Sequence, residues 1–264
     1  MMARYIDTHC HLQLAQFAND RDEIIARMRT QGVAAVVVGD DLESSKDAVA
    51  LAEKYEHIFA CVGIHPEHAM EQKYDMAHIR SLIAHPKVVA IGECGLEYFH
   101  IPADDAIRQA QKELFQKHIA LAAELDKPLM IHVRPTRGTH DAYADVIAMI
   151  QDAKTAHPNV RGNIHFFAGS LEEANEFFAL DFTISFTAVV TFTHNYDEVI
   201  KKVSLENILS ETDAPFVAPA SRRGERNDPL AIIDVVNQIA AIRGDDPETV
   251  RQTILANAQC LFTL

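Results

Sequence analysis

The chain has 264 residues, of which 48% are hydrophobic and 23% are charged, and it contains no tryptophan. This composition excludes a disordered, collagen-like or coiled-coil protein, and the length suits one α/β barrel, a fold that commonly uses about 200–250 residues. A formal net charge of -14 disfavours a protein that grips nucleic acid through a long basic groove, although bound metal ions can supply positive charge locally.

Short apolar segments alternate along the chain with longer amphipathic ones. Most of the apolar segments are continuous, as expected for parallel strands that are covered on both faces. Helical periodicity is clearest over residues 104–126 and 229–243. Asn19 or Asp20 is placed to cap the helix after the first strand, and Gly32 is placed to end it. We expect strands at residues 4–7, 34–38, 58–62, 88–91, 129–133, 163–166, 182–186 and 208–210.

Eight strand–helix units predict a (β/α)8 barrel of the TIM type, as a single domain over residues 1–264. An open, doubly wound sheet is the alternative, but the sequence lacks its glycine-rich dinucleotide signature. Residues 214–228, which contain prolines and several arginines, are expected to form a loop after the last strand. No apolar run approaches the ~18 residues of a membrane span. Four scattered cysteines without a CxxC pair favour a reducing, cytoplasmic location.

Six ionisable residues lie at the ends of the expected strands. Active sites of this architecture are at the C-terminal end of the barrel, where these side chains are expected to meet. Singly, each is better explained by a structural role, except the pair at i and i+2, which projects to one side of a strand. Jointly, four imidazoles and two carboxylates suit a site for two divalent ions. They are His9 and His11, Glu93, His132, His165 and Asp213.

Further side chains are candidate substrate contacts. His65 ends the third strand, and we weigh a substrate contact equally with a ring that bonds the backbone before Pro66. Arg134, two residues beyond His132, is expected to point the same way and to meet an anionic substrate. The cluster of Arg222, Arg223 and Arg226, followed by Asn227, is interpreted as a substrate-binding or lid segment, with a solvated loop as the alternative.

The remaining histidines and the cysteines receive structural interpretations. His85 and His157 precede prolines in turns from helix to strand, and His118 falls on the apolar face of its helix. Cys10 and Cys94 adjoin candidate ligands but alternate away from them on an extended chain, so we expect buried, inert thiols.

As a set, the segments DTHCHL, GIHPE, IGECGLEY, PLMIHVR, GNIHFFAG, ETDAPF, GERNDP and NAQCLF are highly specific. The sequence resembles the TatD-type metal-dependent deoxyribonucleases, a branch of the amidohydrolase-like barrel hydrolases, and the likeness covers nearly the whole chain. The resemblance implies two divalent metal ions (Mg, Mn or Zn). It implies that His9, His11, Glu93 and Asp213 hold one ion, and that Glu93 bridges to a second ion held by His132 and His165.

The sequence departs from the pattern of this family at Glu67, Glu97 and Phe166, where histidine, aspartate and cysteine are commoner. These positions bear on substrate preference more than on metal binding. Several relatives bridge their metals through a carbamylated lysine, but here Glu93 offers the carboxylate directly. Lys127 lies at the entrance of its strand, which is the wrong end of the barrel. Metal assembly is therefore expected not to depend on dissolved CO₂.

The function that we infer is hydrolysis of phosphodiesters at DNA ends, with Asp213 accepting the proton of the attacking water and Glu93 bridging the metals. The resemblance implies digestion from the 3′ end of single strands or frayed ends. The alternatives are hydrolysis of a small ester, lactone or amide at the same site, and a metal-dependent nucleic-acid-binding protein without turnover. We expect no membrane association and no obligate protein partner.

Overall fold

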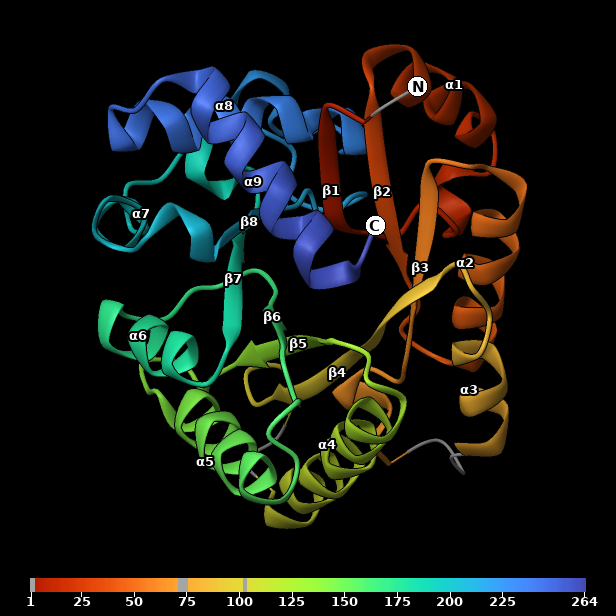
Figure 1. The fold of residues 1–264 in the computed structure, drawn as a ribbon, viewed down its shortest axis with the longest axis vertical. Helices are drawn as coiled ribbons and strands as arrows, with labels where there is room; N and C mark the ends of the chain where they lie inside the picture. Colours follow the sequence, from red (N-terminus) through yellow and green to blue (C-terminus); the bar gives the residue numbers. More distant parts are fainter. Residues whose placement is uncertain (1–2, 71–75, 102–103) are drawn as a thin grey trace.

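The computed structural model describes residues 3–70, 76–101 and 104–264. One sheet of eight parallel strands runs in the order β1 to β8 (Figure 1), which confirms the predicted barrel. Cys10, the last residue of β1, pairs with Ala214, which follows β8, and this bridge brings the first and last strands together. The strands are β1 Tyr5–Cys10, β2 Val33–Val38, β3 Ile58–Val62, β4 Val88–Glu97, β5 Leu129–Arg134, β6 Gly162–Ile164, β7 Phe182–Phe186 and β8 Ile208–Ser210.

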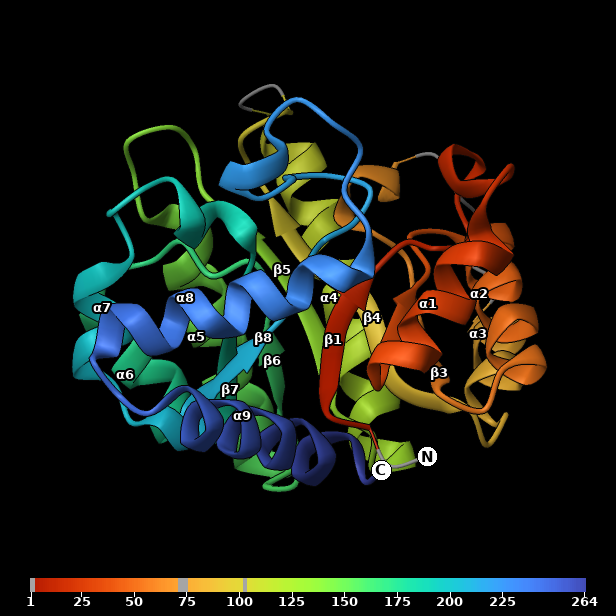
Figure 2. The ribbon, with the colours of Figure 1, turned by 90° about the horizontal axis from the view of Figure 1, so that it is seen from above.

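Helices surround the barrel on its outside (Figure 1) and pack apolar side chains against the strands. The loops that follow the strands lie on the upper side in Figure 2, and we call this end of the barrel the mouth. The last helix covers the opposite end, and its Ala258, Leu261 and Phe262 belong to one apolar cluster with strand residues such as Ile6 and Ala34. The helices are α1 Arg21–Gln31, α2 Leu42–Lys54, α3 Met76–Ile83, α4 Asp105–Leu125, α5 Asp141–Ala156, α6 Leu171–Ala179, α7 Asp197–Lys202, α8 Ile232–Arg243 and α9 Pro247–Phe262.

The strand limits differ from the prediction where polar residues are buried. β1 continues to Cys10 rather than residue 7, and β4 continues to Glu97 rather than residue 91. A prediction from hydrophobicity ends these strands too early, because polar residues near their ends face the inside of the barrel. His9 and Glu93 are therefore within strands and not in the loops after them. The loop at 214–228 is confirmed and includes one short 3-10 turn, Ala220–Arg222. None of the helices in the described part of the chain is long and apolar enough to cross a membrane.

The predicted caps of α1 have different outcomes. Asp20 occupies the N-cap position, but its side chain makes no capping bond, because the carboxylate pairs with Arg226 instead. Gly32 ends the helix as predicted, with φ 70°, and its N–H donates to the carbonyl oxygens of Met28 and Arg29. This left-handed conformation is one that glycine adopts without steric cost.

Gly32→Ala is expected to lower the free energy of unfolding by about 1–2 kcal/mol, because an L-residue is strained in this conformation. A Cβ at Gly32 would also lie 3.2 Å from Cγ of Arg4. Gly244 is the matched control, since it ends α8 with φ 73° and a Cβ there meets nothing within 4 Å. Urea unfolding of Gly32→Ala and Gly244→Ala separates the backbone strain, which both variants have, from the steric contact with Arg4, which only Gly32→Ala has. If Gly32→Ala matched the wild type, the conformational argument would be wrong.

Candidate metal centre

His9 and His11 lie beside each other at the end of β1. Their side chains project to the same side, as residues at i and i+2 of a strand do, and their Nε2 atoms are 3.2 Å apart. The Nδ1–H of His11 donates to the carbonyl oxygen of Val38, at the end of β2, over 2.8 Å. This bond fixes the ring and leaves the Nε2 lone pair available for a metal ion.

Glu93, on β4, lies at the centre of the candidate site. Its Oε2 is 3.3 Å from Nε2 of His9 and 3.9 Å from Nε2 of His11. Its Oε1 is 2.9 Å from Nε2 of His165 and 3.1 Å from Nδ1 of His132. One carboxylate thus faces two separate pairs of imidazoles, each pair with a different oxygen atom.

Asp213 follows β8 and adds a second carboxylate to the β1 histidines. Its Oδ1 is 3.5 Å from Nε2 of His11 and 3.9 Å from Nε2 of His9. Its backbone has φ 54°, and its N–H donates to the carbonyl oxygen of His9 over 2.9 Å. Aspartate is one of the non-glycine residues that adopt this left-handed backbone most readily. The side chain of Asp213 is 14% exposed against 5% for Glu93, so Asp213 has the readier access to solvent.

The structure therefore brings all six predicted ligands together, and we call His9, His11, Glu93, His132, His165 and Asp213 the ligand cluster. The strands explain this convergence, because the C-terminal ends of β1, β4, β5, β6 and β8 meet at the mouth.

Two buried carboxylates that the sequence analysis did not assign to the site orient its histidines. Glu97 accepts a hydrogen bond from Nε2 of His132 over 3.1 Å, which turns Nδ1 of that ring toward Glu93. Glu211 places its Oε1 3.4 Å from Nδ1 of His165. Each acid lies at a strand end, Glu97 as the last residue of β4 and Glu211 directly after β8. An acidic residue at a strand end was thus the feature of the sequence that could have assigned both residues to the site.

Glu97 is held rigidly in its orienting role. Its Oε1 accepts from the backbone N–H groups of Phe99 and His100, over 2.6 and 2.9 Å. Burial opposes its ionisation, but the bond from His132 and these backbone bonds lower the pKa of Glu97 to about 2. Glu97 is therefore an anion, which is the state that accepts a hydrogen bond from the His132 ring.

The electrostatics of the ligand cluster fit bound cations. Burial disfavours a charged imidazole, but Asp213 and Glu93 raise the pKa of His11 to about 9. Burial would raise the pKa of Glu93, yet the surrounding imidazoles hold it well below its ordinary value. The cluster therefore draws in positive charge, and ligand atoms of His9, His11 and Glu93 lie within 4.8 Å of one another. Imidazole nitrogen with carboxylate oxygen is a donor set that divalent transition metals favour.

His65 bonds the backbone, as one of the two interpretations predicted, although its partner lies after Pro66 and not before it. Its Nδ1 accepts the backbone N–H of Glu67 over 3.2 Å, so the proton of the neutral ring is on Nε2. That Nε2 lies 3.6 Å from Oε1 of Glu93. Burial lowers the pKa of His65 to about 3, which keeps the ring neutral. His65 therefore presents an N–H donor to the site.

Arg134 and Arg223 lie on aromatic rings. The guanidinium of Arg134 is 4.5 Å from the ring centre of Phe99, in the segment after β4. The guanidinium of Arg223 is 4.0 Å from the ring centre of Phe192, in the segment after β7. Arg134 is the last residue of β5, and Phe99, Phe192 and Arg223 lie in loops of the mouth, so these arginines remain candidate substrate contacts.

The structure does not bring Arg226 and Asn227 to the ligand cluster. Arg226 binds the carboxylate of Asp20 and the carbonyl oxygen of Gln16, which ties the loop to the segment before α1. Asn227 is buried, and its amide donates to the carbonyl oxygens of Thr212 and Val217. In the structure both residues hold the loop that follows Asp213, because their polar atoms are taken up by bonds within the protein.

The residues interpreted as structural behave as predicted where the structure addresses them. His118 is buried, donates to the carbonyl oxygen of Leu114 over 2.9 Å and accepts the N–H of Ile64. The buried thiols of Cys10 and Cys94 have pKa values raised well above the ordinary range by burial, which keeps them protonated. Neither can serve as a thiolate nucleophile at neutral pH.

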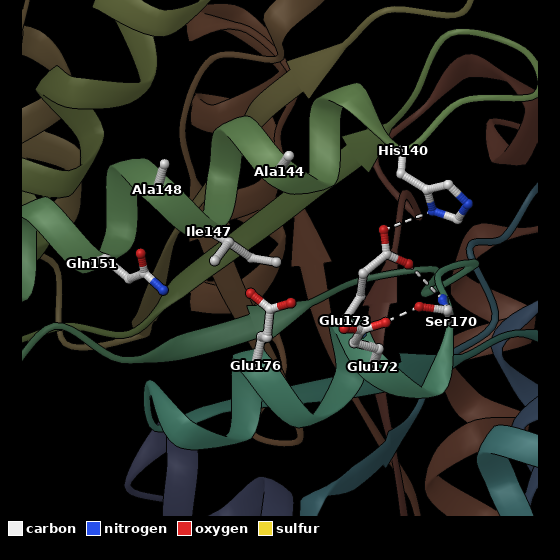
Figure 3. Close-up of a pocket in the computed structure, with 9 residues that line it drawn as sticks. All are labelled: His140, Ala144, Ile147, Ala148, Gln151, Ser170, Glu172, Glu173 and Glu176. Carbon is white, nitrogen blue, oxygen red and sulfur yellow. Dashed lines mark hydrogen bonds and ion pairs between the residues drawn. The ribbon is translucent and has the colours of Figure 1, made fainter.

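A cavity of about 550 Å³ lies away from the ligand cluster, between α5 and α6 (Figure 3). Its apolar floor contains Ala144 and Ile147, and its acidic side contains Glu172 and Glu176. Glu173 bonds His140 at its edge over 2.8 Å. This cavity shares no residue with the ligand cluster, and the described residues that line it include no group of three side chains that could hold a metal ion.

Comparisons with known proteins identify the family that the chain resembles along nearly its whole length. Residues 6–263 match the model of a family described as TatD related DNase. The chain is 37% identical to the uncharacterized metal-dependent hydrolase YabD of Bacillus subtilis, with 98% of each chain covered. It is 34% identical to the 3'-5' ssDNA/RNA exonuclease TatD of Cronobacter sakazakii, with 97% of each covered. A crystal structure of YjjV, a TatD homologue from Escherichia coli, superposes with a TM-score of 0.87 at 29% identity and covers 100% of both chains.

Proposed function

We propose that this chain, which belongs to the TatD-related DNase family of metal-dependent hydrolases, uses two divalent metal ions to remove nucleotides from the 3′ ends of single-stranded or frayed DNA. The observation that carries the two-metal proposal is the division of the Glu93 carboxylate, whose two oxygens face different pairs of histidines. The name of the Cronobacter relative supports action at 3′ ends and extends the substrates to be tested to RNA.

The ligand cluster divides into two sets that share Glu93. When bound, Mg²⁺, Mn²⁺ or Zn²⁺ would act as Lewis acids on the phosphoryl oxygens and would lower the pKa of water. Glu93 makes a carbamylated lysine unnecessary, and Lys127 donates to the carbonyl oxygen of Val88 at the opposite end of β4. The first set is His9, His11, Glu93 and Asp213, and the second is Glu93, His132 and His165.

The side chains around the metals have separate roles in the proposed reaction. The carboxylate of Asp213 accepts the proton of the attacking water, and its exposure lets it pass that proton to solvent. His65 Nε2–H donates to a phosphoryl oxygen, which it reaches because it lies beside Glu93. Glu97 and Glu211 keep His132 and His165 in orientation through their second ring nitrogens.

The positive charge that can bind a polyanion is confined to a small area at the mouth. Arg222 is paired with Asp228, and Arg226 with Asp20, whereas Arg134, Arg223 and the exposed Arg137 after β5 are placed to meet phosphates at the mouth. Together with metal ions they can neutralise roughly one to three phosphates. A footprint of this size, on a chain of net charge -14, supports binding of a strand end rather than of a long duplex.

We place the protein in the cytoplasm, as its scattered cysteines indicate.

Chelation tests the proposal. Excess EDTA is expected to abolish hydrolysis of a single-stranded oligonucleotide, and added Mg²⁺, Mn²⁺ or Zn²⁺ is expected to restore it. Elemental analysis of protein purified without chelator should give about two ions per chain, since the cluster has two donor sets. Full activity in excess EDTA would contradict metal dependence.

A substrate panel separates the proposed activity from the alternatives. Strands labelled at the 3′ or the 5′ end, blunt duplexes, closed single-stranded circles, RNA and small aryl esters are compared. The 3′-labelled linear strand is expected to lose its label first, because the mouth accommodates an end. Circles cut as fast as linear strands would contradict end recognition, and faster cleavage of the esters would favour the small-ester alternative.

A further inference from the structure

We propose that exposed phenylalanines at the mouth form a platform on which unpaired bases of the substrate stack, with Phe216 holding the base nearest the ligand cluster. This inference rests on the proposed function, since it names how the nucleic acid is held. Phe99, Phe192 and Phe216 are 42%, 40% and 49% exposed. In the described part of the chain they are three of the five large hydrophobic side chains with substantial exposure, and all three follow strand ends at the mouth.

Phe216 is held beside the ligand cluster by the same turn as Asp213. Its backbone N–H donates to the carbonyl oxygen of Asp213 over 2.9 Å. Its ring centre is 6.1 Å from that of His11, with the two planes at 69°. A base on this ring would therefore place its own phosphate within reach of the cluster, as the span of one nucleotide allows.

Phe99 and Phe192 extend the platform on other loops of the mouth. Each carries a guanidinium over its ring, from Arg134 and Arg223 respectively. A guanidinium is itself a planar group, and bases stack on such planes as they do on aromatic rings. The same cation attracts the adjacent phosphate.

The loops that carry these side chains are tied to one another. The N–H of Ala220, in the segment after β8, donates to Oγ1 of Thr191, next to Phe192, over 2.8 Å. The N–H of Phe99 donates to Glu97, which also binds His132. The aromatic side chains are thus connected to the residues that orient the ligand cluster.

The chemistry of the platform selects the substrate. Every base has a flat π-face, so stacking on phenylalanine tolerates any sequence. In a duplex these faces are covered by neighbouring bases, and the platform can act only on bases that are unpaired. Preference for single strands and frayed ends then has a physical cause in these side chains, beyond the width of the barrel.

Binding measured with two matched ligands tests the inference. One ligand is an oligothymidylate, and the other is an abasic strand with the same number of phosphates. The wild-type protein, loaded with metal, is expected to bind the thymidylate at least about 5-fold more tightly than the abasic strand. Phe216→Ala should remove most of that difference, and Phe216→Leu should also remove it, since leucine keeps apolar volume without a flat ring. Phe216→Tyr should keep it.

The absence of tryptophan from the chain supplies a second readout. Phe216→Trp introduces a single tryptophan, which can be excited apart from the six tyrosines, and the thymidylate is expected to quench its emission while the abasic strand leaves that emission unchanged. Leu264→Ala, an exposed apolar residue at the chain terminus, is the control and should bind both ligands like the wild type.

The outcomes separate the two proposals. Base-dependent binding and quenching without hydrolysis would uphold the platform and overturn the proposed activity. Equal binding of both ligands by the wild type and by Phe216→Ala would overturn the platform, whatever the activity. Loss with Phe216→Ala but retention with Phe216→Leu would also overturn it, because the contact would then be apolar packing and not stacking.

Discussion

Asp213→Asn is expected to lower turnover by about 10²-fold or more, in line with the usual contribution of a general base, while substrate affinity changes little. Asparagine keeps an oxygen of similar position and tolerates the left-handed backbone at this residue, where φ is 54°. It cannot accept the proton of the attacking water. Single-turnover rates at saturating metal, with separate binding measurements, distinguish loss of the base from loss of a ligand.

Asp181 supplies the matched control for this variant. It also has a left-handed backbone, with φ 61°, and it pairs with Lys154 immediately before β7, at the far end of the barrel. Asp181→Asn should therefore keep the wild-type rate. If Asp213→Asn bound metal weakly but regained the full rate once saturated with metal, Asp213 would act as a ligand alone and the general-base role would be wrong.

Glu93→Gln is expected to have the largest effect of any single change, because it removes the carboxylate that both metal sets share. We expect turnover to fall on the order of 10³-fold, since metal-derived charge stabilisation is worth several kcal/mol. An amide offers one oxygen and one N–H group, so it cannot face both pairs of histidines as an acceptor. Elemental analysis should show that both ions are lost or weakened.

Two further variants make the Glu93 result specific. His165→Ala removes a ligand from the second set alone and should lower the metal content toward one ion per chain. Glu173→Gln alters another buried glutamate, which bonds His140 outside the ligand cluster, and should leave metal content and turnover unchanged. Circular dichroism checks that each variant is folded. Retention of two ions by Glu93→Gln would contradict the bridging role.

The fold could be predicted from the sequence because its signals are local. Continuous apolar segments such as Val33–Val38 and Ile58–Val62 mark strands that are covered on both faces, and both end at the predicted residue. The six candidate ligands could also be found, since strand order in a parallel barrel brings all C-terminal ends to one face. A local pattern that repeats along the chain thus predicts both the architecture and the position of the site.

The limits of β1 and β4 could not be predicted, because they depend on what the inside of the barrel contains. Polar residues ordinarily end a strand signal, yet His9 and Glu93 are inside strands. Their burial is favourable only when imidazoles and carboxylates from other strands lie within a few ångströms. Sequence patterns contain no information on such distant neighbours.

By itself, the sequence determined the barrel and the chemical nature of the ligands, since both follow from residue type and spacing. The tertiary structure alone decided which neighbours each polar atom has. It showed that Glu97 and Glu211 orient histidines, and that Arg226 and Asn227 hold a loop. The physical reason is that hydrogen bonds and ion pairs act over about 3 Å between residues far apart in the chain. A residue's role is therefore set by its contacts, which only the folded barrel creates.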